Sequence, residues 1–226
     1  MAKFLFLIRM FVEKSTEQDA EFNRWYWDEH LPALTQVPGV LGARRYFHVA
    51  SYYPDSPKYI AFYELTDSSV MESKEWNSRA YSSEWARRTA PQEGNAGVYE
   101  EIVPKTDDGK IEASCLYVNR IYPKPDMNDF FRDWVENTLF PEARKVNGVL
   151  KCRFYNATGN AHRNTPTFLL IFELRDAKVV NDEGWTRLAS PDGILKPVRD
   201  VVLLKNFPGV YEQLLPPQNP GLTLRW

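Results

Sequence analysis

The sequence is poor in the residues that build metal and disulfide sites. Its 226 residues include only two cysteines and three histidines. Cys115 and Cys152 are not spaced as CxxC, so we expect two buried, reduced thiols, which suits a cytoplasmic protein. The HxH and HExxH metal patterns are absent, as are the GxGxxG, Walker and GxSxG signatures. The sequence therefore predicts neither a metal nor an organic cofactor.

Long runs of like charge and long apolar runs are also lacking. The formal net charge is −2, without the clustered basic patch of a nucleic-acid surface. No apolar stretch approaches the roughly 20 residues of a membrane span. Residues 4–11 are apolar, but Arg9 interrupts them and no small-residue cleavage site follows, so we read a strand rather than a signal peptide. We expect a cytoplasmic protein that binds neither nucleic acid nor membrane.

The chain contains two copies of one unit. When it is shifted by 109 residues, 22–76 align with 131–185 without a gap, and fifteen of the 55 pairs are identical. The match continues outward with small shifts, so that Arg9 falls on Arg120, and 97–100 fall on 209–212 with the same letters, Gly-Val-Tyr-Glu. A fold built from two similar halves is expected, and functional residues are expected where the halves differ.

Each copy reads as strand, helix, strand, strand, helix, strand. In the first copy the expected strands are 4–11, 43–50, 59–65 and 97–103. The first expected helix begins at Ser15, and the second spans 68–88. We divide the chain into a first repeat (1–103), a linker (104–112), a second repeat (113–215) and a C-terminal tail (216–226).

A βαββαβ unit is a ferredoxin-like sandwich of the α+β class, with helices on one face of an antiparallel sheet. One unit of this size leaves its other sheet face bare. Two tandem units can bury both faces by closing into an α+β barrel with an interior pocket, and a homodimer of such chains is a further expectation.

In the first copy, an aromatic-rich helix with Trp25, His30 and Pro32 is followed by Pro38-Gly39 and by Arg44-Arg45-Tyr46. With this pattern the first copy resembles the EthD-like family of the dimeric α+β barrel superfamily. The second copy matches weakly: Leu139 replaces the histidine and Asn147 replaces the proline before the glycine. The residues that remain are Trp134, Pro141, Gly148, Arg153 and Tyr155. The resemblance implies a pocket for a hydrophobic or aromatic molecule. Relatives include cofactor-free monooxygenases, cyclases, decarboxylases, dehydratases and isomerases, and haem enzymes share the wider fold.

His30 is the sharpest catalytic candidate, because histidine exchanges protons near neutral pH and its counterpart in the second copy is a leucine. The alternative is a histidine that caps the end of its helix. A haem would need an axial imidazole from His30, His48 or His162. His162 is expected in an exposed loop.

A second group of candidates lies on one face of the second strand, where Arg44, Tyr46 and His48 alternate. We expect Arg44 and Tyr46 to stabilise negative charge and His48 to carry a proton. Ala157 replaces His48 in the second copy, so the first half is the expected reactive half. A structural alternative pairs the repeated arginines with Glu64 and Glu173.

Substrate binding is assigned to aromatic and polar residues of both copies, since aromatics make up 14% of the chain. These candidates are Tyr26, Trp27, Tyr63, Arg153 and Tyr155. Arg9 and Arg120 recur in apolar strands, so each needs a partner or a wet cavity, and structural pairing is the favoured interpretation.

The first functional hypothesis is a cofactor-independent enzyme that acts on an aromatic or other hydrophobic small molecule by general acid/base chemistry. Elimination by a lyase or dehydratase, in aromatic catabolism or specialised metabolism, suits such a site. The alternatives are a cofactor-free monooxygenase of a phenolic substrate, an isomerase, and a non-catalytic protein that binds a hydrophobic metabolite.

Overall fold

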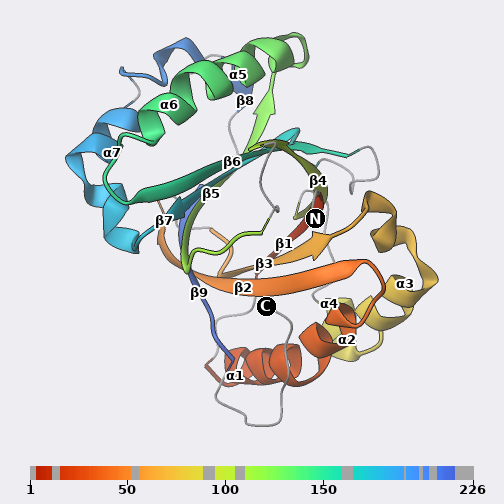
Figure 1. Cartoon of the computed structure of the whole chain (residues 1–226). Coiled ribbons are helices and arrows are strands. Elements are labelled where there is room, and N and C mark those ends of the chain that lie inside the picture. Colours follow the sequence, from red (N-terminus) through yellow and green to blue (C-terminus); the bar gives the residue numbers. More distant parts are fainter. Residues whose placement is uncertain are drawn as a thin grey trace.

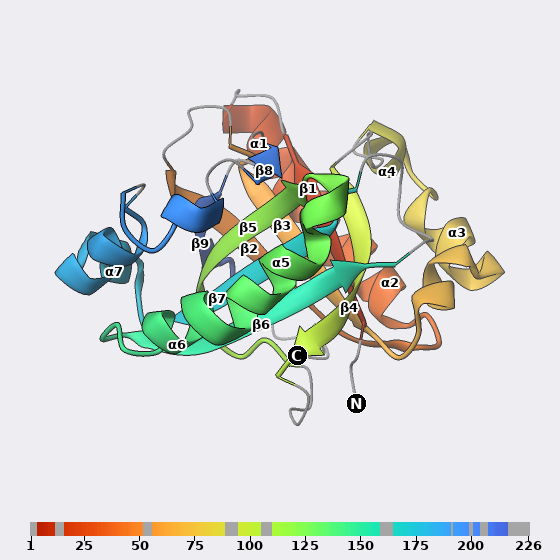
Figure 2. The same ribbon diagram turned by 90° about the horizontal axis from the view of Figure 1, so that it is seen from above.

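The two copies close into one eight-stranded barrel with helices on its outside (Figure 1). The computed structural model describes residues 4–11, 16–51, 56–88, 95–104, 110–158, 165–190, 192–198, 201–203 and 208–216. Two groups of helices cover opposite outer sides of the barrel, one from each copy (Figures 1 and 2).

The described strands and helices follow the predicted order in both copies. The first copy contains β1 (Phe4–Met10), α1 (Thr16–Trp25), α2 (Leu31–Thr35), β2 (Val40–Ser51), β3 (Tyr59–Leu65), α3 (Lys74–Ala80), α4 (Glu84–Arg88) and β4 (Ala96–Val103). The second contains β5 (Cys115–Pro123), α5 (Asn128–Trp134), α6 (Phe140–Ala143), β6 (Val149–Ala157), β7 (Phe168–Leu174), α7 (Glu183–Leu188), β8 (Val202–Leu203) and β9 (Gly209–Gln213).

Each copy forms a four-stranded antiparallel sheet with the ferredoxin-like strand order. The orders are β4-β1-β3-β2 and β9-β5-β7-β6. Pairing of β2 with β9 and of β4 with β6 joins the two sheets edge to edge, so the eight main strands form a closed ring. Closure leaves these strands without an open edge. The predicted pair of ferredoxin-like repeats in an α+β barrel is confirmed.

The helices are more broken than the sequence predicted. The prediction of one continuous helix over 68–88 was wrong, because this stretch contains a 3₁₀ turn (Ser68–Glu72), α3 and α4. The side chain of Ser73 accepts a hydrogen bond from the amide of Trp76 and starts α3 afresh. The first helix runs from α1 through a π-helical turn, Tyr26–His30, into α2. Ser15, its expected start, lies outside the described residues, as do His162 and tail residues 217–226.

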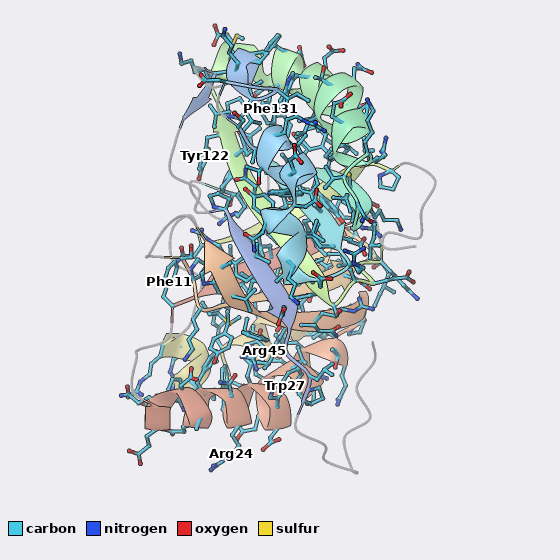
Figure 3. All side chains as sticks on the ribbon, turned by 90° about the vertical axis from the view of Figure 1, so that its left-hand side faces the viewer. Phe11, Arg24, Trp27, Arg45, Tyr122 and Phe131 are labelled. Carbon is cyan, nitrogen blue, oxygen red and sulfur yellow. The ribbon has the colours of Figure 1, made fainter. Side chains whose placement is uncertain are left out.

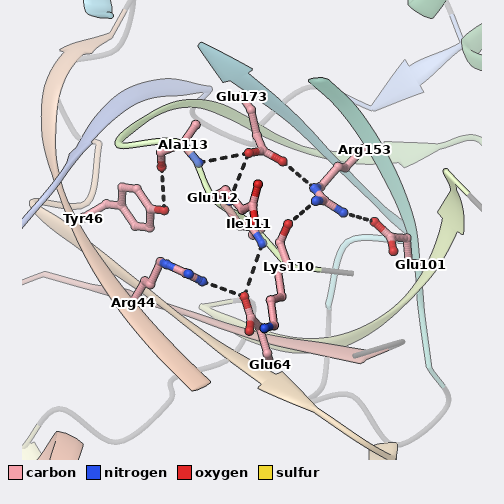
Figure 4. Close-up of polar contacts among 10 residues, drawn as sticks. All are labelled: Arg44, Tyr46, Glu64, Glu101, Lys110, Ile111, Glu112, Ala113, Arg153 and Glu173. Atoms are coloured by element: carbon pink, nitrogen blue, oxygen red, sulfur yellow. Dashed lines mark hydrogen bonds and ion pairs between the residues drawn. The ribbon is translucent and has the colours of Figure 1, made fainter. Parts of the chain in front are cut away.

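The barrel interior is filled by side chains and by part of the linker. Buried interior side chains come from all eight main strands and include Leu5, Leu7, Tyr46, Tyr99, Tyr155 and Tyr211. Residues 110–113 enter the same space, where Glu64 accepts a hydrogen bond from the amide of Ile111 (Figure 4). Glu173 accepts from the amides of Glu112 and Ala113, both at 3.0 Å. The expected pocket inside the barrel is therefore largely occupied by the chain itself.

Among the described residues, no helix combines the length and the apolar character needed to cross a bilayer.

Candidate functional site

A small cavity lies between the sheet and the helices of the first copy, on the outer side of the barrel wall. Strand alternation directs Phe6, Ile8 and Met10 of β1 toward the helices, while Leu5 and Leu7 face the barrel. The cavity has a volume of about 30 Å³. Its lining is mostly apolar: Phe6, Ile8, Met10, Tyr26, His30, Leu34, Tyr63, Met71, Trp76, Ala80, Tyr81 and Ala86.

His30 is the one imidazole in the lining of this cavity. It ends the π-helical turn, and its ring lies 4.5 Å from the ring of Trp25 and 4.9 Å from that of Tyr26. Burial and, to a smaller extent, the positive charge of Arg45 together lower the pKa of His30 to about 4. The imidazole is therefore neutral at pH 7 and can accept a proton.

Two tyrosine hydroxyls meet beside this histidine. The oxygens of Tyr26 and Tyr63 are 2.7 Å apart and share a hydrogen bond. Burial raises the pKa of both phenols, so both keep their protons at neutral pH. One of the two hydroxyls donates its proton to the oxygen of the other. The hydroxyl that accepts this hydrogen bond keeps its own proton, which it can donate to a ligand.

Arg45 lies behind Tyr26 in a cage of aromatic rings, between the barrel and α1 (Figure 3). Its guanidinium carbon is 4.0 Å from the ring centre of Tyr26 and 5.1 Å from that of Trp27. Its Nη2 donates to Oδ1 of Asn23 at 2.9 Å. Its Nε and Nη1 are buried without a hydrogen-bond partner among the described residues. Sequence reasoning did not select Arg45, although it holds the positive charge nearest to this site.

The second copy carries no polar counterpart of the site. In the alignment, Leu139 replaces His30, Val135 replaces Tyr26, Phe172 replaces Tyr63 and Phe154 replaces Arg45. All four replacements are buried in the second copy's apolar core. The Arg45/Phe154 difference was thus a signal in the sequence that could have pointed to this position.

The structure separates the predicted site residues by a wall of the barrel. His30, Tyr26 and Tyr63 lie together under the helices of the first copy. Trp27 is buried nearby and packs on Arg45 instead of lining the cavity. Arg44, Tyr46, His48, Arg153 and Tyr155 belong to the face of β2 and β6 that is turned to the barrel interior.

Inside the barrel, the repeated arginines have carboxylate partners (Figure 4). Arg44 pairs with Glu64 at 2.7 Å, and Arg153 pairs with Glu173 and Glu101, both at 2.6 Å. The pairs with Glu64 and Glu173 are those of the structural alternative that the sequence left open, and the contact of Arg153 with Glu101 was not expected.

Tyr46 donates to the carbonyl of Ala113 at 3.0 Å, so it helps to hold the linker. The hydroxyl of Tyr155 is buried, and burial together with the nearby carboxylate of Glu101 raises the pKa of the phenol. His48 is half-buried against Tyr211, with ring centres 5.4 Å apart. Burial lowers the pKa of His48 too.

The described residues fit neither a disulfide nor a metal. Cys115 and Cys152 are free and buried, as predicted, and burial raises the pKa of each thiol to about 12. No three His, Cys, Asp or Glu side chains among the described residues are grouped to hold an ion.

Haem does not fit the two described histidines either. Rings of Trp25 and Tyr26 pack on His30, and its cavity of about 30 Å³ is far below the roughly 300 Å³ at which sites for such ligands begin. His48 packs against Tyr211, and its Nε2 is buried.

Solved structures share this architecture over nearly the whole chain. An anthrone oxidase-like protein aligns with a TM-score of 0.64 at 13% identity, over 94% of this chain and 92% of its own. Chlorite dismutase from Candidatus Nitrospira defluvii, solved with imidazole, gives 0.61 at 11%, over 92% and 90%. The chain has the dimeric α+β barrel fold. A protein assigned as a monooxygenase from Fusobacterium nucleatum gives 0.54 at 14%, over 93% and 94%. Identities this low establish the fold alone.

Comparisons of sequence gave no match: no protein-family model fits the chain, and no curated protein is significantly similar to it.

Proposed function

We propose that the protein is a cofactor-independent enzyme that removes a proton from an aromatic small molecule in the cavity of the first copy. The observation that carries the proposal is a neutral, partly buried His30 beside the hydroxyl pair of Tyr26 and Tyr63. In the second copy, residues that cannot exchange protons replace all three. The layer between sheet and helices is apolar in both copies, but only that of the first copy contains groups that can exchange protons. Such groups are expected where a reaction takes place.

His30 acts as the general base in this proposal. A base whose pKa is about 4 is weak, so the substrate must form a well-stabilised anion. A phenolic ketone, or a methylene group between aromatic rings and a carbonyl, meets this requirement because its charge spreads over the rings and onto an oxygen. The free hydroxyl proton of the Tyr26–Tyr63 pair donates to that oxygen. Arg45, against the ring of Tyr26, is a positioning residue whose charge favours the anion.

Oxygenation is the reaction we favour after proton removal. The substrate anion reacts with dioxygen, a CH₂ group becomes C=O, and the second oxygen atom leaves as water with the two hydrogens. The names of two neighbours with this fold, a monooxygenase and an anthrone oxidase-like protein, support this choice. The EthD-like resemblance of the first copy agrees with it.

Elimination is the second candidate, and the hydroxyl pair favours it. Both phenols keep their protons, so the pair can protonate a leaving oxygen while His30 removes a proton from the neighbouring carbon. A lyase or dehydratase would use the same residues as an oxygenase, so only the product distinguishes the two.

The cavity must widen before an aromatic molecule can bind. Even benzene occupies an engineered cavity of about 150 Å³, several times the volume seen here. Tyr81, which is 37% exposed, and the partly buried Met71 lie at the solvent side of the lining. We expect these two side chains to move outward when substrate enters.

Oxygen uptake and product mass test the proposal. Anthrone, as an oxygenase probe, and a hydroaromatic alcohol that can lose water should be incubated with wild type, His30→Leu and His48→Ala. Each variant introduces the residue of the second copy, so His48→Ala is the matched control. Turnover should fall about 10²–10⁴-fold in His30→Leu and stay unchanged in His48→Ala.

The product decides between the two reactions. Oxygen uptake with a gain of one oxygen and a loss of two hydrogens supports oxygenation, whereas loss of water without oxygen uptake supports elimination. Tight binding of the probes without any turnover would instead make the chain a non-catalytic binding protein and refute the proposal. Homodimer formation and a cytoplasmic location stay predictions, and native mass spectrometry tests the first.

A further inference from the structure

A second polar cluster lies inside the barrel, on the other side of the sheet from the His30 cavity. It consists of Arg9 and Tyr99 from the first copy and their counterparts Arg120 and Tyr211 from the second. Tyr99, Tyr211 and Arg120 are buried, and Arg9 is partly buried. Because each residue recurs in the repeat, the cluster has the approximate twofold symmetry of the barrel itself.

The strand order brings these four side chains to the same point. In the ring of eight strands, β1 and β5 are four strands apart in either direction, so Arg9 and Arg120 extend toward each other from opposite walls. The side chains meet near the middle, because Nε of Arg120 donates across the barrel to the hydroxyl of Tyr99 at 3.1 Å. This contact leaves the hydroxyl proton of Tyr99 free to donate to another group.

The cluster has positive charge but no acidic partner for Arg9 in the described part of the chain. Arg9 donates one long hydrogen bond of 3.4 Å to Asn95, and its Nε and Nη1 are buried without a partner among the described residues. Burial and the positive charge of Arg120 together lower the pKa of Arg9 to about 10. A buried guanidinium with unused donors is costly unless an anion or water occupies the space in front of it.

The other pair of repeated arginines in the barrel has carboxylate partners within the protein. Arg44 and Arg153 recur in the two copies just as Arg9 and Arg120 do, yet each has a glutamate partner within 2.7 Å. Among the described residues, the layer of Arg44 and Arg153 therefore contains the carboxylates that pair with its arginines, whereas Arg9 has no carboxylate partner.

We propose that Arg9, Arg120, Tyr99 and Tyr211 form a binding site for one small oxyanion, either a carboxylate or a phosphate group, inside the barrel. Guanidinium groups bind both classes through charged hydrogen bonds, and tyrosine hydroxyls add neutral donors. The site is independent of the proposed reaction at His30, because it uses the opposite face of the sheet.

Calorimetric titration tests the site with two small probes, inorganic phosphate and acetate, at constant ionic strength set by sodium chloride. The proteins are wild type, Arg9→Met, Arg120→Met and the control Arg24→Gln. Arg24 is exposed on α1 and points away from the barrel (Figure 3). Phe11 follows Arg9 closely in the sequence, Tyr122 follows Arg120 closely, and both lie on another side of the molecule from Arg24 (Figure 3). We expect one anion per chain for wild type and Arg24→Gln, and at least about tenfold weaker binding for both methionine variants.

The probe that binds more tightly identifies the source of the oxyanion, an organic carboxylate or a phosphate group. Absence of saturable binding of both probes to wild type, or equal affinity in Arg9→Met and Arg24→Gln, would overturn the proposal.

Measurement of thermal unfolding midpoints provides a second test of the site if a variant folds too poorly for titration. In chloride alone, Arg9→Met should unfold at or above the wild-type temperature, because it removes a buried charge without a counter-charge. Saturating anion should raise the wild-type midpoint and leave that of Arg9→Met unchanged. A lower midpoint for both Arg9→Met and Arg9→Gln in chloride alone would show that Arg9 is paired within the protein and would refute the site.

Discussion

His30 should make the protein less stable as the pH falls, and His30→Leu should remove this effect. The pKa of the imidazole is about 4 in the folded protein, against about 6.5 in an unfolded chain. Between these values the unfolded chain binds the proton and the folded protein does not, so stability is lost as the pH falls below 6.5 and the loss is complete below 4. From pH 7.5 to 4.5, this difference lowers the free energy of unfolding by about 2.5 kcal/mol.

Leucine is the matched replacement, because Leu139 fills the equivalent place in the second copy and is 5% exposed there. Urea unfolding of wild type and His30→Leu at both pH values gives the contribution of His30, since every other titrating group is common to the two proteins. The wild type should lose about 2.5 kcal/mol more than the variant. Equal losses in the two proteins would show that the pKa of His30 is not lowered in the folded state, and the argument for a base held neutral by the protein would fail.

Three further substitutions test the neighbours of the site and the linker. Tyr63→Phe should lower the free energy of unfolding by about 1–3 kcal/mol, measured by urea titration, because it leaves the partner hydroxyl buried and unpaired. Arg45→Met should raise the pKa of His30, followed by imidazole proton NMR, because the nearby positive charge is gone; an unchanged pKa would contradict the assigned cause. Glu173→Gln should cost about 3–5 kcal/mol, since the buried carboxylate holds an arginine and two linker amides. The exposed control Glu75→Gln should change stability by less than about 0.5 kcal/mol.

The barrel could be predicted from the sequence because the two copies align over 55 residues without a gap. Such an alignment requires the same strands and helices in both copies, and the bare sheet of one copy can be buried only against the other. The helix ends were harder to predict. The break of the expected helix at 68–88 depends on Ser73, whose side chain caps the start of α3. Serine favours helix starts but also occurs within helices, so its presence alone did not locate the break.

The site was half predictable. His30 was selected because its counterpart is Leu139, and that reasoning placed it in the only copy with a polar cavity lining among the described residues. Tyr26 and Tyr63, which were expected to bind substrate, lie beside His30. The other catalytic candidates, Arg44, Tyr46 and His48, lie on the face of β2 that is turned to the barrel interior. Both faces of the sheet are buried, one in the barrel and one under helices, and every residue of β3 and β7 is buried. Polar alternation along a strand therefore could not reveal which face contacts the helix that carries His30.

The linker was predicted as a polar connection, which its composition favours. Its entry into the barrel depends on carboxylates from β3 and β7, and on Tyr46 of β2, which are distant in sequence. No local pattern records contacts of this kind, so they appear only when the barrel is assembled.

Hydrogen–deuterium exchange at carbon tests the central claim most directly, because proton removal is common to oxygenation and elimination. Anthrone in D₂O without oxygen, followed by proton NMR, reports loss of the methylene signal. We expect wild type and His48→Ala to accelerate this loss well above the buffer rate, and His30→Leu to return it to that rate. Exchange that is equally fast in His30→Leu, or no acceleration by wild type although anthrone binds, would contradict the assignment of His30 as the catalytic base.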